Sequence, residues 1–352
     1  MRVTPLFLGA VGMACPVGLS APAACAAIRA RINRFQESRY THDDEEPIVC
    51  SELSLLPARM LHRERLLALL GLAVADATQG MDPSNLARIP LLVGTSEQKR
   101  PGGVSELIPD ALAQLQQEHG VQLSTLHSRC LPMGKTGGLH ALAAARELLA
   151  RDPRLPGCLV AGVDSLVNAP SLWWLKQNQR LKGRGQSDGV IAGEAAACIL
   201  VTRRPPEGLQ PVEVAGLSFA HESATLDSDE PLRAAGLTQA SRAALLEAGL
   251  SMEDMDFRLS DASGEGYAFK ELALVLARVL RVRKETLPLW LPAECLGETG
   301  AAMALVSLIW ATVAMRRGYA PGPRAISYSA SDSGDRAVAV LRAHEVKRGG
   351  AK

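Results

Sequence analysis

The chain has 352 residues, of which 47% are hydrophobic and 21% are charged, and its formal net charge is +1. This length is enough for one large hydrophobic core or for two halves that share an interface. The balanced charge provides no long-range attraction to nucleic acids or acidic lipid surfaces, so we expect no nucleic-acid or membrane partner.

Strand-like and helix-like apolar segments alternate along the chain, which predicts a layered α/β fold. The predicted strands are residues 5–12, 90–94, 158–162, 195–201, 212–219, 257–260, 325–329 and 337–341. The predicted helices are residues 21–33, 61–78, 137–151, 171–176, 239–248, 268–279 and 299–316. The most apolar helical segment, 300–315, is too short to span a membrane and fits a buried core helix.

The cysteines and the first residues indicate the cellular compartment. The seven cysteines, an odd number, contain no Cys-x-x-Cys pair and stand mostly in apolar surroundings, as reduced buried thiols do. The start of the chain has a short apolar run interrupted by Pro5 and Gly9, which favours a first strand over a signal peptide. We therefore expect a cytoplasmic protein without disulfides, bound metal or cofactor.

The segment 203–211 contains three prolines and forms the clearest break in the chain. A glycine-punctuated turn followed by an Ala-rich helix occurs on both sides of this break, at 134–149 and from 297 onward. This repeat predicts an internal duplication, with an N-terminal half at 1–205 and a C-terminal half at 206–352.

The most informative segment is 131–149, LPMGKTGGLHALAAARELL, which predicts a tight turn that leads into a helix. A side chain in this turn stands at the helix N-terminus, where free N–H groups and the helix dipole lower the pKa of a thiol. Lys135 occupies this position and gains nothing from that field. The position is suited to a nucleophile but holds a different residue.

Four further segments share a pattern with a known family. They are GAVGMACPVG (9–18), LVGTS (92–96), VAGVDSL (160–166) and DGVIAGEAAA (188–197), of which the last is the most specific. Together they resemble the β-ketoacyl-ACP synthases, condensing enzymes of the thiolase fold, over nearly the whole chain. The resemblance implies a thiolase-like, five-layered α-β-α-β-α arrangement of two pseudo-duplicated halves.

The chemistry of that family needs a catalytic Cys, two His and a gating Phe, and the resemblance places each on this sequence. The Cys position holds Lys135, the first His position holds Ser263, and the gating Phe position holds Asp332. The segment that corresponds to the second His, 291–302, contains no His and no Lys. The combined loss implies that no catalytic residue is intact and that the chain does not catalyse decarboxylative condensation.

Lys135 has three interpretations: a solvated side chain, a buried Lys paired with an acid, or a catalytic amine that forms a Schiff base. Pairing is favoured, because an unpaired ammonium in an apolar pocket is costly. The resemblance brings Glu265, Glu298 and Asp332 to loops around the former site, and we expect one of them within salt-bridge distance of Lys135. Glu194 matches a family residue that braces these loops, and it is the remaining possible pocket residue.

Five other residues have structural interpretations that outweigh catalytic ones. Cys130 and Cys295 are expected to be buried thiols rather than displaced nucleophiles. His140 has no Asp nearby in the sequence and is expected to be packed or to lie at an interface. Trp173 and Trp174 are expected to anchor the core or a subunit interface.

The resemblance implies two alternative functions. The first is a partner, scaffold or accessory subunit, as a homodimer through the strand near 153–163 or as a heterodimer with a related synthase. An acyl carrier protein is a further partner in this role, and an association with a secretion system is also implied. The alternative is a 3-oxoacyl-ACP synthase-type acyltransferase or a hydrolase in lipid or polyketide metabolism, with a site rebuilt from Lys135, Ser263 or Glu265. An open apolar tunnel to Lys135 would favour the second function, and a site closed by ion pairs would favour the first.

Overall fold

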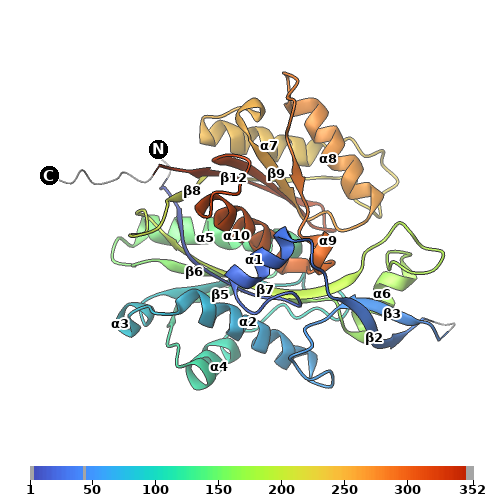
Figure 1. Ribbon diagram of the computed structural model, residues 1–352, viewed down its shortest axis with the longest axis horizontal. Coiled ribbons are helices and arrows are strands. Elements are labelled where there is room, and N and C mark those ends of the chain that lie inside the picture. The colour runs from blue at the N-terminus through green and yellow to red at the C-terminus, as the bar shows by residue number, and fades with distance from the viewer. Residues whose placement is uncertain (1–3, 43–44, 346–352) are drawn as a thin grey trace.

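The computed structural model describes residues 4–42 and 45–345. Figure 1 shows their arrangement, and the elements are, in chain order, β1 (Phe7–Ala14), α1 (Ala21–Arg29), β2 (Phe35–Thr41), β3 (Pro47–Ser51), α2 (His62–Thr78), α3 (Pro83–Leu86), β4 (Pro90–Gly94), α4 (Asp110–His119), β5 (Ser124–Leu131), η1 (Gly134–Thr136), α5 (Gly137–Arg151), β6 (Cys158–Ser165), α6 (Ala169–Gln177), β7 (Ala192–Thr202), β8 (Val212–His221), α7 (Ala235–Ala248), η2 (Met252–Asp254), β9 (Phe257–Ser260), α8 (Gly266–Val279), β10 (Leu289–Trp290), α9 (Ala293–Leu296), η3 (Gly300–Ala302), α10 (Met303–Arg316), β11 (Arg324–Ala330) and β12 (Asp335–Ala343).

The elements form five alternating layers of helices and strands. In Figure 1, α7 and α8 cover the strands β8, β9 and β12, while α2 and α4 cover the strands β5, β6 and β7 at the other side. The helices α5 and α10 lie between the two groups of strands. Hydrogen bonding runs in the order β10-β9-β11-β12-β8-β1-β7-β6-β4-β5, and only two residue pairs join β1 to β8, so the sheet changes layers at this junction.

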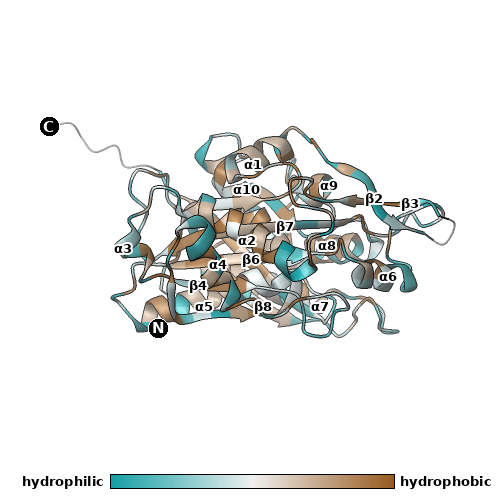
Figure 2. Cartoon of the chain, turned by 90° about the horizontal axis from the view of Figure 1, so that it is seen from below, coloured by the Kyte–Doolittle hydropathy of each residue, from teal (hydrophilic) through white to brown (hydrophobic). Residues whose placement is uncertain are grey.

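Three apolar clusters hold the layers together. The largest lies between the strand layers and contains Leu142 of α5 and Leu305 of α10, both fully buried. A second cluster joins α2 to the outer face of β4, β6 and β7, and a third joins α7 and α8 to β11 and β12. Figure 2 shows the same distribution, with hydrophobic residues concentrated in α10 and the central strands. Burial of this apolar surface is the main source of stability of such a layered fold.

The two strand groups come from different parts of the sequence. Strands β1 to β7 belong to 1–205 and strands β8 to β12 belong to 206–352. In each part a short 3₁₀ turn leads into a central helix, and each turn begins with a glycine at positive φ, Gly134 at 54° and Gly300 at 52°. The division into two halves stays a prediction, and both parts contribute to the one largest core cluster.

The structure contains the helices and strands that long apolar runs predict. It also contains strands with mostly polar sequences, which the sequence analysis did not predict. Strand β1, helix α2 and helix α10 lie within a few residues of their predicted positions. Strands β2 and β5 are mostly exposed at the margins of the sheets, so they lack the apolar run that makes a strand visible in a sequence.

One structural expectation is wrong. The predicted homodimer contact through the strand near 153–163 would need a free strand edge. Strand β6 (Cys158–Ser165) pairs with β4 on one side and with β7 on the other, so it is an interior strand. The free edge on this side of the sheet belongs to β5.

Two features bear on the expected environment of the chain. Within 4–42 and 45–345, no helix has both the length and the apolar character needed to cross a bilayer. All seven cysteines are free thiols, and all except Cys130 are buried.

Candidate functional site

Lys135 lies in the 3₁₀ turn η1, directly before helix α5. The Ser329 hydroxyl at the end of β11 donates a 2.7 Å hydrogen bond to the Lys135 carbonyl oxygen, which ties the turn to β11. The backbone of Gly134 has a positive φ of 54°, which favours glycine, and a Cβ atom there would stand 1.7 Å from a carboxylate oxygen of Glu97, so that side chain would have to move. The local sequence therefore places Lys135 at the N-terminal end of α5, as the glycine-rich pattern predicts.

The Lys135 ammonium forms an ion pair with Glu298, which precedes η3. The Nζ atom lies 2.5 Å from Glu298 Oε2, and the two side chains are 14% and 4% exposed. The Ser263 hydroxyl donates to the same carboxylate oxygen at 2.5 Å, and the Gly300 backbone N–H donates to Oε1 at 2.8 Å. The predicted pairing of Lys135 with a carboxylate is thus present, and Glu298 is the acid.

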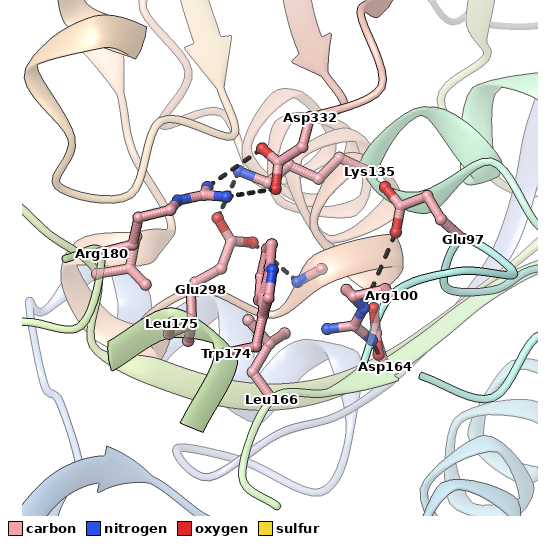
Figure 3. A pocket seen from close by; sticks show the side chains of 12 residues that line it. Glu97, Arg100, Lys135, Asp164, Leu166, Trp174, Leu175, Arg180, Glu298 and Asp332 are labelled. Atoms are coloured by element: carbon pink, nitrogen blue, oxygen red, sulfur yellow. Dashed lines mark hydrogen bonds and ion pairs between the residues drawn. The ribbon is translucent and has the colours of Figure 1, made fainter. Parts of the chain in front are cut away.

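The other two predicted acids pair with an arginine instead. Arg180, in the loop after α6, binds Glu265 at 2.6 and 2.9 Å and Asp332 at 2.7 and 3.1 Å. Its guanidinium carbon lies 5.1 Å from the ring centroid of Trp174. Figure 3 shows the side chains of Arg180, Asp332, Lys135 and Glu298 pointing toward one another. Arg180 stands in a polar, glycine-bearing loop, and nothing in that local sequence marks it as a buried residue.

A second charged group lies on the other side of the same cavity. Arg100 forms an ion pair with Asp164 of β6 and lies 3.8 Å from Glu97. The second Asp164 oxygen accepts a 3.0 Å hydrogen bond from the Ala301 N–H in η3. Burial raises the pKa of Glu97, and the positive charge of Arg100 opposes this effect. The sequence analysis does not predict this group, although Asp164 lies in one of the segments that carry the resemblance.

The surrounding acids keep Lys135 charged. Burial alone would lower the pKa of Lys135, but the carboxylates of Glu298, Asp261 and Asp332 outweigh it and raise this pKa above its usual value of 10.5. Because a Schiff base forms only from a neutral amine, the catalytic-amine interpretation of Lys135 is disfavoured. Burial would raise the pKa of Asp332, and the charges of Arg180 and Lys135 reverse the shift, so its pKa is lowered.

These side chains nearly fill the space around Lys135. The remaining cavity is about 20 Å³, which is room for about one water molecule. Figure 3 shows its walls, which in the described part of the chain include no Cys and no His. The cavity is therefore a small charged space rather than an open apolar tunnel.

Glu194 does not line this cavity, which corrects its place among the possible pocket residues. It is fully buried and binds Arg65 of α2 at 2.6 and 2.8 Å. It also accepts hydrogen bonds from the Leu53 N–H at 2.7 Å and the Ser165 hydroxyl at 2.9 Å. Its carboxylate thus links α2, β6, β7 and the segment after β3, and it braces the structure as the resemblance implies.

Cys130 and Cys295, which the sequence analysis weighed as displaced nucleophiles, lie among packed protein atoms. Burial raises the pKa of the Cys130 thiol to about 11, and its sulfur accepts a hydrogen bond from the Leu107 N–H at 3.4 Å. Cys295 is buried beside the Ile28 carbonyl oxygen of α1, and burial raises its pKa as well. Neither residue lines the cavity at Lys135. Cys295 is buried as predicted, whereas Cys130 is only partly buried, so the expectation of a buried thiol is wrong for Cys130.

The remaining predicted residues differ in how far they are packed. His140 on α5 stacks on Phe219 of β8, with ring centroids 4.2 Å apart, which confirms the packed interpretation. Trp174 lines the Lys135 cavity, whereas Trp173 on the same helix is 63% exposed and does not anchor the core. Its place at a subunit interface stays a prediction. Within the described ranges, no group of three or more His, Cys, Asp or Glu side chains is arranged to hold a metal ion.

Comparison with known proteins identifies the fold. No protein-family model matches the chain, and no curated protein matches it. Among solved structures, the acyl carrier protein–ketosynthase complex AntDE:AntF of a type II PKS matches with a TM-score of 0.79, at 15% identity, over 98% of this chain and 100% of that one. The ketosynthase ApeO in complex with its chain length factor ApeC, from Xenorhabdus doucetiae, matches with a TM-score of 0.73, at 15% identity, over 97% and 98%. The ishigamide ketosynthase/chain length factor matches with a TM-score of 0.67, at 18% identity, over 97% and 100%. The chain therefore has the thiolase-like fold of the ketosynthases, as the sequence resemblance predicts.

Proposed function

We propose that this chain is a ketosynthase-like subunit without condensing activity, and that it acts as the partner of a related, catalytic ketosynthase. The observation that carries the proposal is the closed, charged cavity at Lys135. A cavity of about 20 Å³ has no room for an acyl chain, and ion pairs hold its walls in place.

The chemistry of the site supports the same conclusion. Condensation in the resembled family starts from a thiolate that accepts an acyl group, and two imidazoles then polarise the thioester carbonyl. Here an ammonium stands at the thiol position, and its pKa is raised, so it is not a nucleophile. The Ser263 hydroxyl, at the position of the first His, already donates to Glu298, whose charge Lys135 neutralises. A Ser–Glu pair compensated in this way is a poor general-base arrangement, which argues against the rebuilt acyltransferase or hydrolase.

The structural neighbours support a partner role. ApeO is described in complex with its chain length factor, and AntDE with an acyl carrier protein. By analogy, we propose a heterodimer with a related ketosynthase, an acyl carrier protein as a further contact of that complex, and a cytoplasmic location. An association with a secretion system stays a prediction from the resemblance.

The first test asks whether the chain accepts an acyl group covalently. After incubation with radiolabelled octanoyl-ACP or octanoyl-CoA and denaturing electrophoresis, we expect no covalent label on the wild-type chain. Lys135→Cys restores a thiol without the imidazoles and should gain no condensing activity with malonyl-ACP, while an active ketosynthase serves as the positive control. Stable labelling of the wild type, or turnover that Lys135→Ala abolishes, would refute the proposal.

The second test asks which protein co-purifies with the chain. The tagged full-length chain, purified from its native cell and sized by light scattering, should carry a ketosynthase with an intact catalytic Cys in a 1:1 complex. Addition of the purified chain to that ketosynthase alone should raise its condensing rate or change its product length. Recovery of the chain only as a monomer or homodimer would contradict the heterodimer.

A further inference from the structure

A groove lies on the outer helical layer formed by α7 and α8, which Figure 1 shows covering β8, β9 and β12. Its lining comes from Arg233 before α7, from α7 itself and from Arg278 of α8. It has a volume of about 690 Å³ and shares no lining residue with the cavity at Lys135. The groove is open to solvent, so it can receive a segment of another molecule.

The charges that line this groove are positive. They belong to Arg233, Arg242 and Arg278, and no acid of the described chain lines the groove. The Arg242 guanidinium donates a 3.2 Å hydrogen bond to the Arg278 carbonyl oxygen in the last turn of α8. Within 4–42 and 45–345, none of the three guanidinium groups forms an ion pair. Guanidinium groups without a carboxylate partner attract carboxylates, which they bind through paired N–H donors.

The acids of this part of the chain are all engaged elsewhere. Glu247 of α7 pairs with Arg146 of α5, and Glu271 of α8 pairs with Arg336 of β12. The other acids between 233 and 284 each accept a hydrogen bond from another residue: Glu253, Asp254, Asp256, Asp261 and Glu265. The exposed charged residues of the same stretch are all basic: Arg233, Arg242, Lys270, Arg281 and Arg283. This stretch therefore presents positive charge to solvent, although the whole chain has a net charge of only +1.

The groove also contains an exposed apolar side chain. Leu246 of α7 is 81% exposed and lines the groove together with Ala235, Gln239 and Ala243. These four residues are three or four positions apart, so they share one face of α7. The small alanine side chains let a second helix approach closely, and the exposed leucine offers it an apolar contact.

From these observations we infer that the groove on α7 and α8 docks an acidic amphipathic helix of a partner protein. The carboxylates of that helix pair with Arg233, Arg242 and Arg278, and its apolar side covers Leu246. A small anion would leave Leu246 uncovered, and a flat lipid surface does not fit into a groove. This inference uses no residue of the Lys135 site and does not depend on the function proposed above.

Fluorescence anisotropy of a labelled synthetic peptide, titrated with the full chain, tests the inference. The peptide has about 18 residues of Glu, Leu and Ala, with Leu on one helical face and Glu on the other. We expect saturable 1:1 binding that weakens by about tenfold or more between about 50 mM and about 500 mM NaCl, because salt screens exposed charges. Arg242→Gln/Arg278→Gln and Leu246→Gln should each weaken binding by about tenfold, since the first removes two charge contacts and the second an apolar contact.

Two controls make the result specific. Lys182→Gln/Arg184→Gln removes two exposed positive charges outside the groove and should leave the affinity unchanged. A scrambled peptide of the same composition has no apolar face and should bind about tenfold more weakly. Thermal melting should show that every variant is folded.

Absence of saturable binding, equal binding of the scrambled peptide, or unchanged affinity in the groove variants would overturn the inference. It would also fail if phosphatidylserine vesicles bound the chain through Arg242 and Arg278 and the peptide did not displace them, because the surface would then serve a lipid membrane.

Discussion

Lys135→Met is expected to lower the free energy of unfolding by about 3 kcal/mol, because it leaves a buried carboxylate without its counter-ion. Glu298 is only 3% exposed, and the Ser263 hydroxyl and the Gly300 N–H would remain as its donors. These two hydrogen bonds place the expected loss at the lower end of the range for a broken buried pair. Urea unfolding at pH 7 to 8 measures the loss.

The double variant Lys135→Met/Glu298→Gln tests the cause of this loss. It removes the ion pair but leaves no Glu298 carboxylate buried without a counter-ion. Because a neutral amide needs no counter-ion, the double variant should be within about 1 kcal/mol of the wild type. The exposed residue Lys182 provides a control, and Lys182→Met should change stability by less than about 0.5 kcal/mol. If Lys135→Met were as stable as the wild type, the Glu298 carboxylate would not need Lys135 as its counter-ion, which would contradict the prediction.

The pH dependence of this contribution follows from the direction of the shift. The folded-state pKa of Lys135 lies above its ordinary value of 10.5, so its stabilising contribution is fully present below that pH. It is lost only as the pH rises through the raised pKa. The difference between wild type and Lys135→Met should therefore not decrease between pH 7 and pH 9.

Arg65→Met is expected to lower the free energy of unfolding by about 3–5 kcal/mol, more than Lys135→Met. Arg65 and Glu194 have side chains that are 4% and 0% exposed, and the guanidinium holds both carboxylate oxygens. The same guanidinium donates to the carbonyl oxygens of Leu53, Leu56 and Pro57. Its removal leaves the Glu194 carboxylate buried without this counter-ion and deletes three hydrogen bonds to backbone carbonyl oxygens.

The same helix provides a matched control. Arg63 on α2 pairs with Asp110, but these side chains are 43% and 52% exposed. Because exposed ion pairs contribute little, Arg63→Met should cost less than about 1 kcal/mol. Equal losses for Arg63→Met and Arg65→Met, measured by urea unfolding, would contradict the bracing role of Glu194.

The buried ion pairs show how a ketosynthase-like fold can hold a closed, charged site. Lys135–Glu298 and Arg180 with its two acids occupy the space around the helix mouth. Buried pairs are not in general more stabilising than apolar packing, so we attribute to them a specific closed arrangement rather than extra stability. The proposed partner role depends on the surfaces of the fold, which a filled site leaves in place.

Local sequence determined the α/β class, the core strands and the turn at Lys135. Long apolar runs such as that of α10 leave few alternatives to burial, and glycines such as Gly134 mark a backbone that other residues cannot adopt. The lack of His in 291–302 is also visible in the sequence, because it concerns residue identity alone. The placement of Lys135 at the Cys position stays a prediction from the resemblance.

The tertiary structure alone decided which charges meet. Glu265, Glu298 and Asp332 are equivalent candidates in the sequence, yet only Glu298 pairs with Lys135, because a loop from a distant part of the chain brings Arg180 to the other two acids. The exposed strand β5 and the interior position of β6 were likewise invisible, since pairing between strands is a long-range property. An ion pair depends on separations of a few ångströms between segments far apart in sequence, and a local pattern holds no information on that distance.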